Sequence, residues 1–125
     1  MNGIHKKTVI LGASNNPARF SYLAANRLKQ KKYEFVPVGI KRGSVAGEEI
    51  LDIRQKPSIG DVDTITLYMN PRNQVPYYDY ILQLNPRRII FNPGTENPEL
   101  AELARNHHIE TIFSCTLVML NQNAY

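Results

Sequence analysis

The chain has 125 residues, of which 42% are hydrophobic, so its length and apolar content are those of one domain with a buried core. Fifteen Lys and Arg against eleven Asp and Glu give a formal net charge of +4. The basic residues are scattered without interleaved aromatic residues, which argues against a nucleic-acid partner and suits a phosphorylated small ligand. A single cysteine excludes an internal disulfide framework and a Cys-rich metal site, and fits a cytoplasmic compartment. The apolar run near the N-terminus is too short for a signal peptide or a membrane span.

Five apolar runs, rich in β-branched residues, are predicted to be strands. They are nearly continuous rather than alternating, which is typical of parallel strands covered on both faces. The runs lie at residues 8–13, 34–40, 64–69, 88–92 and 110–115.

Helical patterns lie between most of these runs. One spans about 19–31, a second covers 75–84, and a third begins with Asn97 as its N-cap and Pro98 at its first position. Residues 41–61 carry three glycines and are predicted to be irregular, with at most a short strand or helical turn. This order predicts an α/β fold: a single Rossmann-like, doubly wound domain over residues 1–125, with about five parallel strands and helices on both faces.

The stretch VILGASNNPARFSY, residues 9–22, runs from a predicted strand through a glycine loop into a helix. A helix N-terminus in this position offers free N–H groups and a positive dipole end, which favour an anion such as phosphate. Only Gly12 matches the dinucleotide motif G-x-G-x-x-G. Ser14 and Asn16 add polar donors, and Arg19 adds a charged fork that can hold a phosphate oxygen. The alternative is that Asn16 and Pro17 merely cap the helix.

Two cations, Lys41 and Arg42, follow the second predicted strand, where NAD-binding domains usually carry an acid for the ribose hydroxyls. A carboxylate at this position would repel a phosphate on the ribose, whereas a cation attracts one. The pair therefore favours NADP or coenzyme A over NAD, unless it is simply a solvated surface pair.

Few residues suit catalysis. Ligands of doubly wound sheets bind beyond the C-terminal ends of the strands, and the three histidines are predicted at the opposite edge. The binding edge has Ser14, Cys115 and scattered acids without a histidine partner, so no catalytic residue and no metal ligand are predicted. Cys115 either exchanges with the thiol of a ligand or is a small buried hydrophobe. The histidines are His5, His107 and His108, and the acids are Glu48, Glu49, Asp52 and Glu96.

The motifs GASNNPARFSY, YEFVPVGIK followed by VAGEEI, NPRNQVP, and a Cys after the fifth strand resemble those of the small standalone CoA-binding proteins. These are similar to the nucleotide-binding domain of the succinyl-CoA synthetase alpha subunit. The resemblance implies coenzyme A as the ligand, with Lys41 near the adenosine phosphate and the segment from Asn70 to Val75 facing the adenine and ribose. It places the pyrophosphate against Gly12, Ala13, Ser14, Asn16 and Arg19.

The larger ligases of this kind carry a catalytic histidine on a further domain, so the chain resembles their binding half. We expect a cytoplasmic CoA or acyl-CoA binding protein without catalytic activity, although the sequence leaves activity open. The alternatives are an NADP-dependent oxidoreductase and a regulatory or partner subunit of an acyl-CoA ligase. We expect no nucleic-acid or membrane partner. The tail, residues 116–125, packs either on its own domain or against a second copy in a homodimer.

Overall fold

The computed structural model describes residues 4–125 and contains a six-stranded sheet in the order β5-β2-β1-β6-β7-β8. All five neighbouring pairs in this sheet are parallel. The strands are β1 (Ile4–Leu11), β2 (Tyr33–Gly39), β5 (Leu51–Asp52), β6 (Thr64–Leu67), β7 (Arg88–Phe91) and β8 (Glu110–Phe113). The predicted fold class is confirmed, and the sixth strand is β5, which joins the edge through two residues only.

The segment predicted to be irregular holds short elements. Two strands of two residues each, β3 (Ser44–Val45) and β4 (Glu48–Glu49), pair as an antiparallel hairpin. β5 is followed by a 3-10 turn, η1 (Ile53–Gln55). Strands of two residues have no periodicity that a sequence pattern can reveal. Their positions therefore depend on pairing with β2 and with each other.

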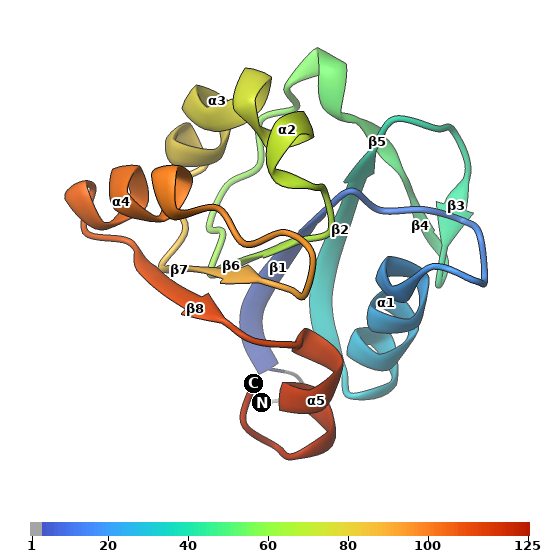
Figure 1. Ribbon diagram of the computed structural model, residues 1–125. Helices are drawn as coiled ribbons and strands as arrows, with labels where there is room; N and C mark the ends of the chain where they lie inside the picture. The colour runs from blue at the N-terminus through green and yellow to red at the C-terminus, as the bar shows by residue number, and fades with distance from the viewer. Residues whose placement is uncertain (1–3) are drawn as a thin grey trace.

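Helices cover both faces of the sheet (Figure 1). One face carries α2 (Pro71–Gln74), the 3-10 turn η2 (Val75–Tyr77), α3 (Tyr78–Gln83) and α4 (Pro98–Asn106). The other face carries α1 (Phe20–Gln30) and α5 (Thr116–Asn121). The single helix predicted over 75–84 is instead divided, because Asn70 and Pro71 begin a helix earlier and Pro76 lies inside the 3-10 turn that follows it. The predicted cap of α4 is confirmed, since Asn97 Oδ1 accepts a hydrogen bond from Leu100 N.

Alternate residues of the central strands supply two separate cores. Val9 and Leu11 face the core under α3 and α4, whereas Ile10 faces the core under α1 and α5. All three side chains are fully buried. This explains why the strand sequences are continuously apolar: both faces of each strand are covered.

The C-terminal tail packs on its own domain. Lys31 Nζ at the end of α1 donates to Asn123 Oδ1, and α5 packs against α1. Tyr125 is buried, with its ring edge-on to Tyr33 and the Arg88 guanidinium 4.5 Å from its centre. Within residues 4–125, no helix has both the length and the apolar character needed to cross a membrane.

Candidate functional site

The strand order reverses between β1 and β6, because the chain winds outward through β2 and β5 and then returns to β6, β7 and β8. This reversal is the usual ligand site of such sheets. Gly12 follows β1 and Tyr68 follows β6 at this point. Gly12 has a φ of 94°, and a Cβ there would lie 2.9 Å from the carbonyl carbon of Tyr68. Only glycine allows both this backbone conformation and this approach of the two loops.

The loop after β1 is held by its own hydrogen bonds. Gly12 N and Ala13 N both donate to Val38 O, at 2.9 and 3.0 Å. Ser14 Oγ accepts from Asn16 N at 3.0 Å, so the hydroxyl hydrogen of Ser14 stays free to donate. Asn16 Oδ1 accepts from Ala18 N at 3.0 Å, which leaves the amide nitrogen of Asn16 without a partner among the described residues. The loop is therefore ordered and still presents polar donors.

The interpretation of Asn16 as a helix cap is wrong, because its side chain bonds within the loop and α1 begins four residues later. The N-cap is Arg19, whose exposed side chain makes no capping hydrogen bond, and the first turn of α1 contains no acidic residue. The N–H groups of Phe20 and Ser21 have no acceptor among residues 4–125. These free N–H groups, the helix dipole and the Arg19 charge together suit an anion.

The loop after β2 lies against the loop after β1. A Cβ on Gly43 would be 2.6 Å from Asn15 Nδ2, so the two loops are in contact. Lys41 and Arg42 lie exposed in this second loop, as the sequence predicts. The structure thus brings Lys41 and the predicted phosphate loop to the same edge of the sheet.

An acid also lies beside the end of β2: the sequence predicts Asp52 at the binding edge as one of several scattered acids, but not its pairing with this strand. β5 pairs Asp52 with Gly39, and Arg54 donates to both carboxylate oxygens of Asp52, at 2.9 and 3.2 Å. Hydrogen bonds from Arg54, and the weaker charge of Arg42, hold the pKa of Asp52 below its ordinary value. The carboxylate is therefore paired, and Lys41 and Arg42 leave an excess of positive charge at this end of the sheet.

A buried glutamine joins the two segments that follow β6 and β7. Gln74 Nε2 donates to Met69 O at 2.8 Å and to Thr95 O at 2.9 Å, while its Oε1 accepts from Asn97 Nδ2 at 2.9 Å. Asn70 caps α2 by accepting from the Asn73 N–H, and Val75 is 53% exposed. The segment from Asn70 to Val75 is thus fixed to the loop after β7. No sequence signal distinguishes Gln74 from an ordinary exposed helix residue.

Asn92 makes a second buried network at the carboxyl end of β7. Its Nδ2 donates to Thr66 Oγ1 at 2.7 Å and to Leu67 O at 2.8 Å, and its Oδ1 accepts from Thr116 N at 2.8 Å. Thr66 and Thr116 also share a hydrogen bond of 2.7 Å. This network ties β6, β7 and the start of α5 together beneath the candidate site. The sequence identifies Asn92 only as part of a loop.

Two further groups lie near this network. The buried hydroxyl of Tyr68 has no hydrogen-bond partner among the described residues, and burial raises its pKa far above the usual range, so it stays protonated. Cys115 is the N-cap residue of α5 and is partly exposed, without a side-chain capping bond. Cys115 is therefore not a fully buried hydrophobe.

Histidines lie away from this edge, as predicted. His107 caps the C-terminus of α4, with Nδ1 2.9 Å from Leu103 O, and His108 forms the turn before β8. His5 falls within β1 rather than before it. Glu96 accepts a hydrogen bond from Gly94 N. Among the residues that the structure describes, no three His, Cys, Asp or Glu side chains are grouped closely enough to hold a metal ion.

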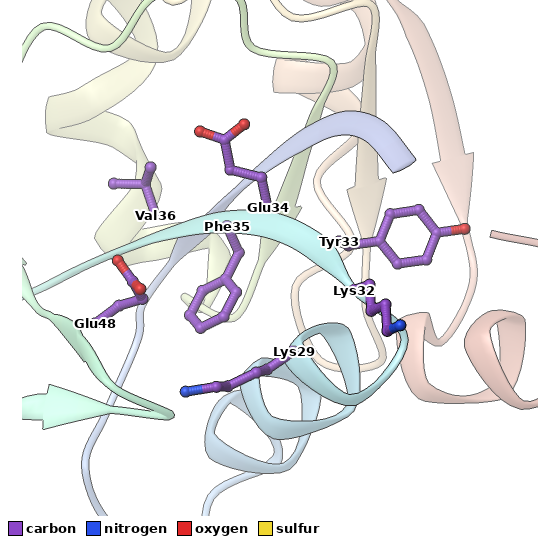
Figure 2. A pocket seen from close by; sticks show the side chains of 7 residues that line it. All are labelled: Lys29, Lys32, Tyr33, Glu34, Phe35, Val36 and Glu48. Carbon is purple, nitrogen blue, oxygen red and sulfur yellow. The ribbon is translucent and has the colours of Figure 1, made fainter. Parts of the chain in front are cut away.

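Two hollows in the surface lie elsewhere. One of about 500 Å³ lies between α1, β2 and β4, and Figure 2 shows Lys29, Phe35 and Glu48 in its wall. It forms because β5 pairs only with Val38 and Gly39, which leaves the first half of β2 without a neighbour on that side. The other, of about 300 Å³, lies between the segment 56–60 and α3. Neither contains a predicted site residue, so the candidate site is an open edge rather than either hollow.

The parallel sheet, the helices on both faces and the glycine-dependent contact at the strand reversal define a Rossmann-like α/β domain. The chain belongs to the CoA binding domain family, whose sequence profile matches residues 6–121. This membership supports coenzyme A as the ligand. No curated protein matches the chain.

Known structures share the fold. The crystal structure of an uncharacterized protein is 52% identical, with a TM-score of 0.92 over 96% of this chain and 98% of that one. Cell-free ID.343 from Thermus thermophilus is 18% identical, with a TM-score of 0.80 over 96% of this chain and 90% of its own. A hypothetical protein from Pyrococcus horikoshii OT3 is 20% identical, with a TM-score of 0.80 over 95% and 83%. At such low identity the last two show similarity of fold alone.

Proposed function

We propose that residues 1–125 form one CoA-binding unit that holds coenzyme A, or an acyl-CoA, across the carboxyl ends of β1, β2 and β6. The observation that carries this proposal is the strand reversal itself, where Gly12 contacts Tyr68 and free N–H groups of α1 face the same edge as the exposed cations. A ligand with a pyrophosphate and a ribose phosphate fits this distribution of charge.

The pyrophosphate lies against the loop of Gly12, Ala13, Ser14 and Asn16, with Arg19 as its charged partner. Two features support this assignment. The internal hydrogen bonds of the loop fix its shape before the ligand binds, which lowers the entropy cost of binding. The donors that these bonds leave free, the Ser14 hydroxyl and the Asn16 amide, can each donate a hydrogen bond to an ionised phosphate oxygen.

The ribose phosphate lies near Lys41, and the adenine and ribose lie against Asn70 and Val75. Pairing of Asp52 with Arg54 supports this arrangement, because the one acid beside Gly39 is already neutralised. Val75 supports it too, because a side chain that is 53% exposed at this edge offers an apolar surface to an adenine ring.

The protein acts by binding, as a carrier or sensor of CoA in the cytoplasm, without catalysing a reaction. His107 and His108, the ordinary candidates for proton transfer, lie at the amino edge. Asn92, at the carboxyl end of β7, is engaged in structure, since it uses its two donors and its acceptor in three hydrogen bonds.

A thermal-shift titration tests the choice of ligand. We expect coenzyme A at about 100 times its Kd to add roughly 2.7 kcal/mol to the free energy of unfolding. NAD, which lacks the ribose phosphate, should add less at the same concentration. A larger shift with NAD would overturn the proposal.

Substitution of Arg19 tests the location. Because a hydrogen bond to a charged group contributes about 1.5 to 3 kcal/mol, Arg19→Ala should weaken CoA binding roughly ten- to hundredfold in calorimetry. The control is Arg27→Ala, which removes the same side chain two turns further along α1. Equal affinities for the two variants would show that the pyrophosphate lies elsewhere.

A further inference from the structure

The two edges of the sheet differ in how they are protected. On one side lies β2, whose backbone orientation follows from the hydrogen bond that Gly12 N donates to Val38 O. This bond shows that the backbone N–H and C=O groups of Val38 point toward β1. Residues of a strand alternate between its two neighbours, so Tyr33, Phe35 and Pro37 face outward. Pro37 has no N–H to offer there, and β5 covers the end of the strand. A proline at this place blocks the addition of another strand.

The opposite edge, β8, has no such protection. Glu110 N donates to Arg87 O and Ser114 N donates to Phe91 O, so Glu110, Ile112 and Ser114 face β7. The N–H and C=O groups of Thr111 and Phe113 therefore point away from the sheet. β8 contains neither proline nor lysine, and Figure 1 shows it at the rim of the sheet, with α4 and α5 on either side and no element beyond it.

The side chains at this edge are also unusual. Phe113 is 49% exposed although its ring stacks on Phe91, with 4.8 Å between ring centres. On the same face, Arg105 Nη1 donates to Thr111 Oγ1 at 3.2 Å, which holds the guanidinium at the rim. The exposed ring of Phe113 and the guanidinium that Thr111 holds thus lie on one face of the open strand, although Arg105 itself belongs to α4.

We infer that β8 is the docking surface for a second copy of this chain, which adds its own β8 in antiparallel orientation. The pattern is self-complementary about a two-fold axis through Ile112: Thr111 then faces the partner's Phe113, and Phe113 faces the partner's Thr111. Each of these two pairs exchanges two backbone hydrogen bonds, so all the outward groups of both residues are satisfied.

This register also matches the side chains. Opposite residues of an antiparallel pair lie on the same face, so the Arg105 guanidinium, held at Thr111, comes to the partner's Phe113 ring. A cation over an aromatic face is attractive. The charge of one copy thus complements the exposed ring of the other, twice over by symmetry. The inference uses no residue of the proposed CoA site and stands independently of it.

The contact is short, so we expect a dimer that dissociates on dilution. Sedimentation equilibrium should give a mass approaching twice the chain mass of 14.3 kDa as concentration rises. Even a weak dimer with a Kd of about 1 mM is partly formed at a protein concentration of about 0.5 mM. A wild-type protein whose mass stays at 14.3 kDa at that concentration would therefore overturn the inference.

Charge substitutions at the two outward positions test the surface. The variants T111E/F113E and T111K/F113K each place like charges opposite one another and should weaken the dimer at least about tenfold. An equimolar mixture of the two should restore a dimer, now with opposite charges paired. The control Q30E/Q83E adds the same charge on exposed helix positions and should dimerise as the wild type does. Unchanged dimerisation of both charged variants would contradict the inference.

A cysteine at the axis tests the register. In an antiparallel pair, Ile112 and the partner's Ile112 are opposite residues without mutual hydrogen bonds, with Cα atoms about 4.5 Å apart, which suits a disulfide. In a C115S background, oxidised glutathione should convert two I112C thiols into one intersubunit disulfide and release two reduced glutathiones. Denaturing electrophoresis should show the cross-linked dimer for I112C and not for Q30C. Equal cross-linking of the two variants would contradict the register.

Discussion

Glycine positions provide a graded test of how the site is built. Gly12→Ala forces a non-glycine residue into a φ of 94° and places its Cβ 2.9 Å from the Tyr68 carbonyl carbon. The backbone conformation costs about 1 to 2 kcal/mol, and the displacement of a packed backbone costs about 1 to 3 kcal/mol more. We therefore expect Gly12→Ala to lower the free energy of unfolding by about 2 to 5 kcal/mol.

Two other glycines separate these contributions. Gly94 has a φ of 92° but nothing within 4 Å of an added Cβ, so Gly94→Ala should cost only about 1 to 2 kcal/mol. Gly60 has an ordinary φ and open space, so Gly60→Ala should be neutral or stabilise by about 0.4 to 1 kcal/mol. Urea unfolding of the three variants measures the series. If Gly12→Ala were no worse than Gly94→Ala, the contact between the β1 and β6 loops would not constrain the site.

Two further substitutions probe the polar framework. Asn92→Ala removes three buried hydrogen bonds and should lower the free energy of unfolding by about 3 kcal/mol. The control Asn121→Ala, at an exposed position of α5, should lower it by well under about 1 kcal/mol. Similar unfolding midpoints of the two variants would refute the role given to Asn92. Burial alone would raise the pKa of Asp63, but hydrogen bonds from Arg87 and Thr64 outweigh it and lower the pKa. A carboxyl group whose pKa is lower in the folded state adds to the free energy of unfolding above its unfolded pKa of about 4, and this contribution is lost as pH falls from there toward the folded-state pKa. Asp63→Asn should therefore reduce stability at pH 7 and make the free energy of unfolding fall less steeply at acid pH. An acid limb as steep as that of the wild type would show that Asp63 does not contribute.

The sequence predicts the sheet and α1, the helix after the first loop, correctly, because both depend on patterns that extend over many residues. The continuous apolar strands, the N-cap at Asn97 and the helix near residues 19–31 all have strong local signals. The predicted helix over 75–84 is divided because Pro76 and the Asn70 cap act together, and their combined effect depends on packing against the loop after β7.

The candidate site is predictable only in part. Gly12 and Lys41 follow strands directly, so their edge of the sheet is fixed once the strands are known. The Asp52 and Arg54 pair could not be found in this way, because β5 has two residues and reaches β2 only through tertiary pairing. Gln74 and Asn92 were missed for a similar reason, since a buried amide and an exposed amide have the same sequence signal.

We propose that a phosphate on the ribose of the ligand lies beside Lys41, and calorimetry of CoA against its analogue without that phosphate measures what this contact contributes to binding. Because exposed charges are screened, we expect a preference for CoA of about 1 kcal/mol per contact, or several-fold in Kd. The preference should shrink at higher ionic strength and in Lys41→Ala, while Lys56→Ala, at an exposed lysine of the hollow beside α3, should leave it unchanged. Equal affinities of the wild type for the two ligands at low salt would show that Lys41 does not bind a ribose phosphate.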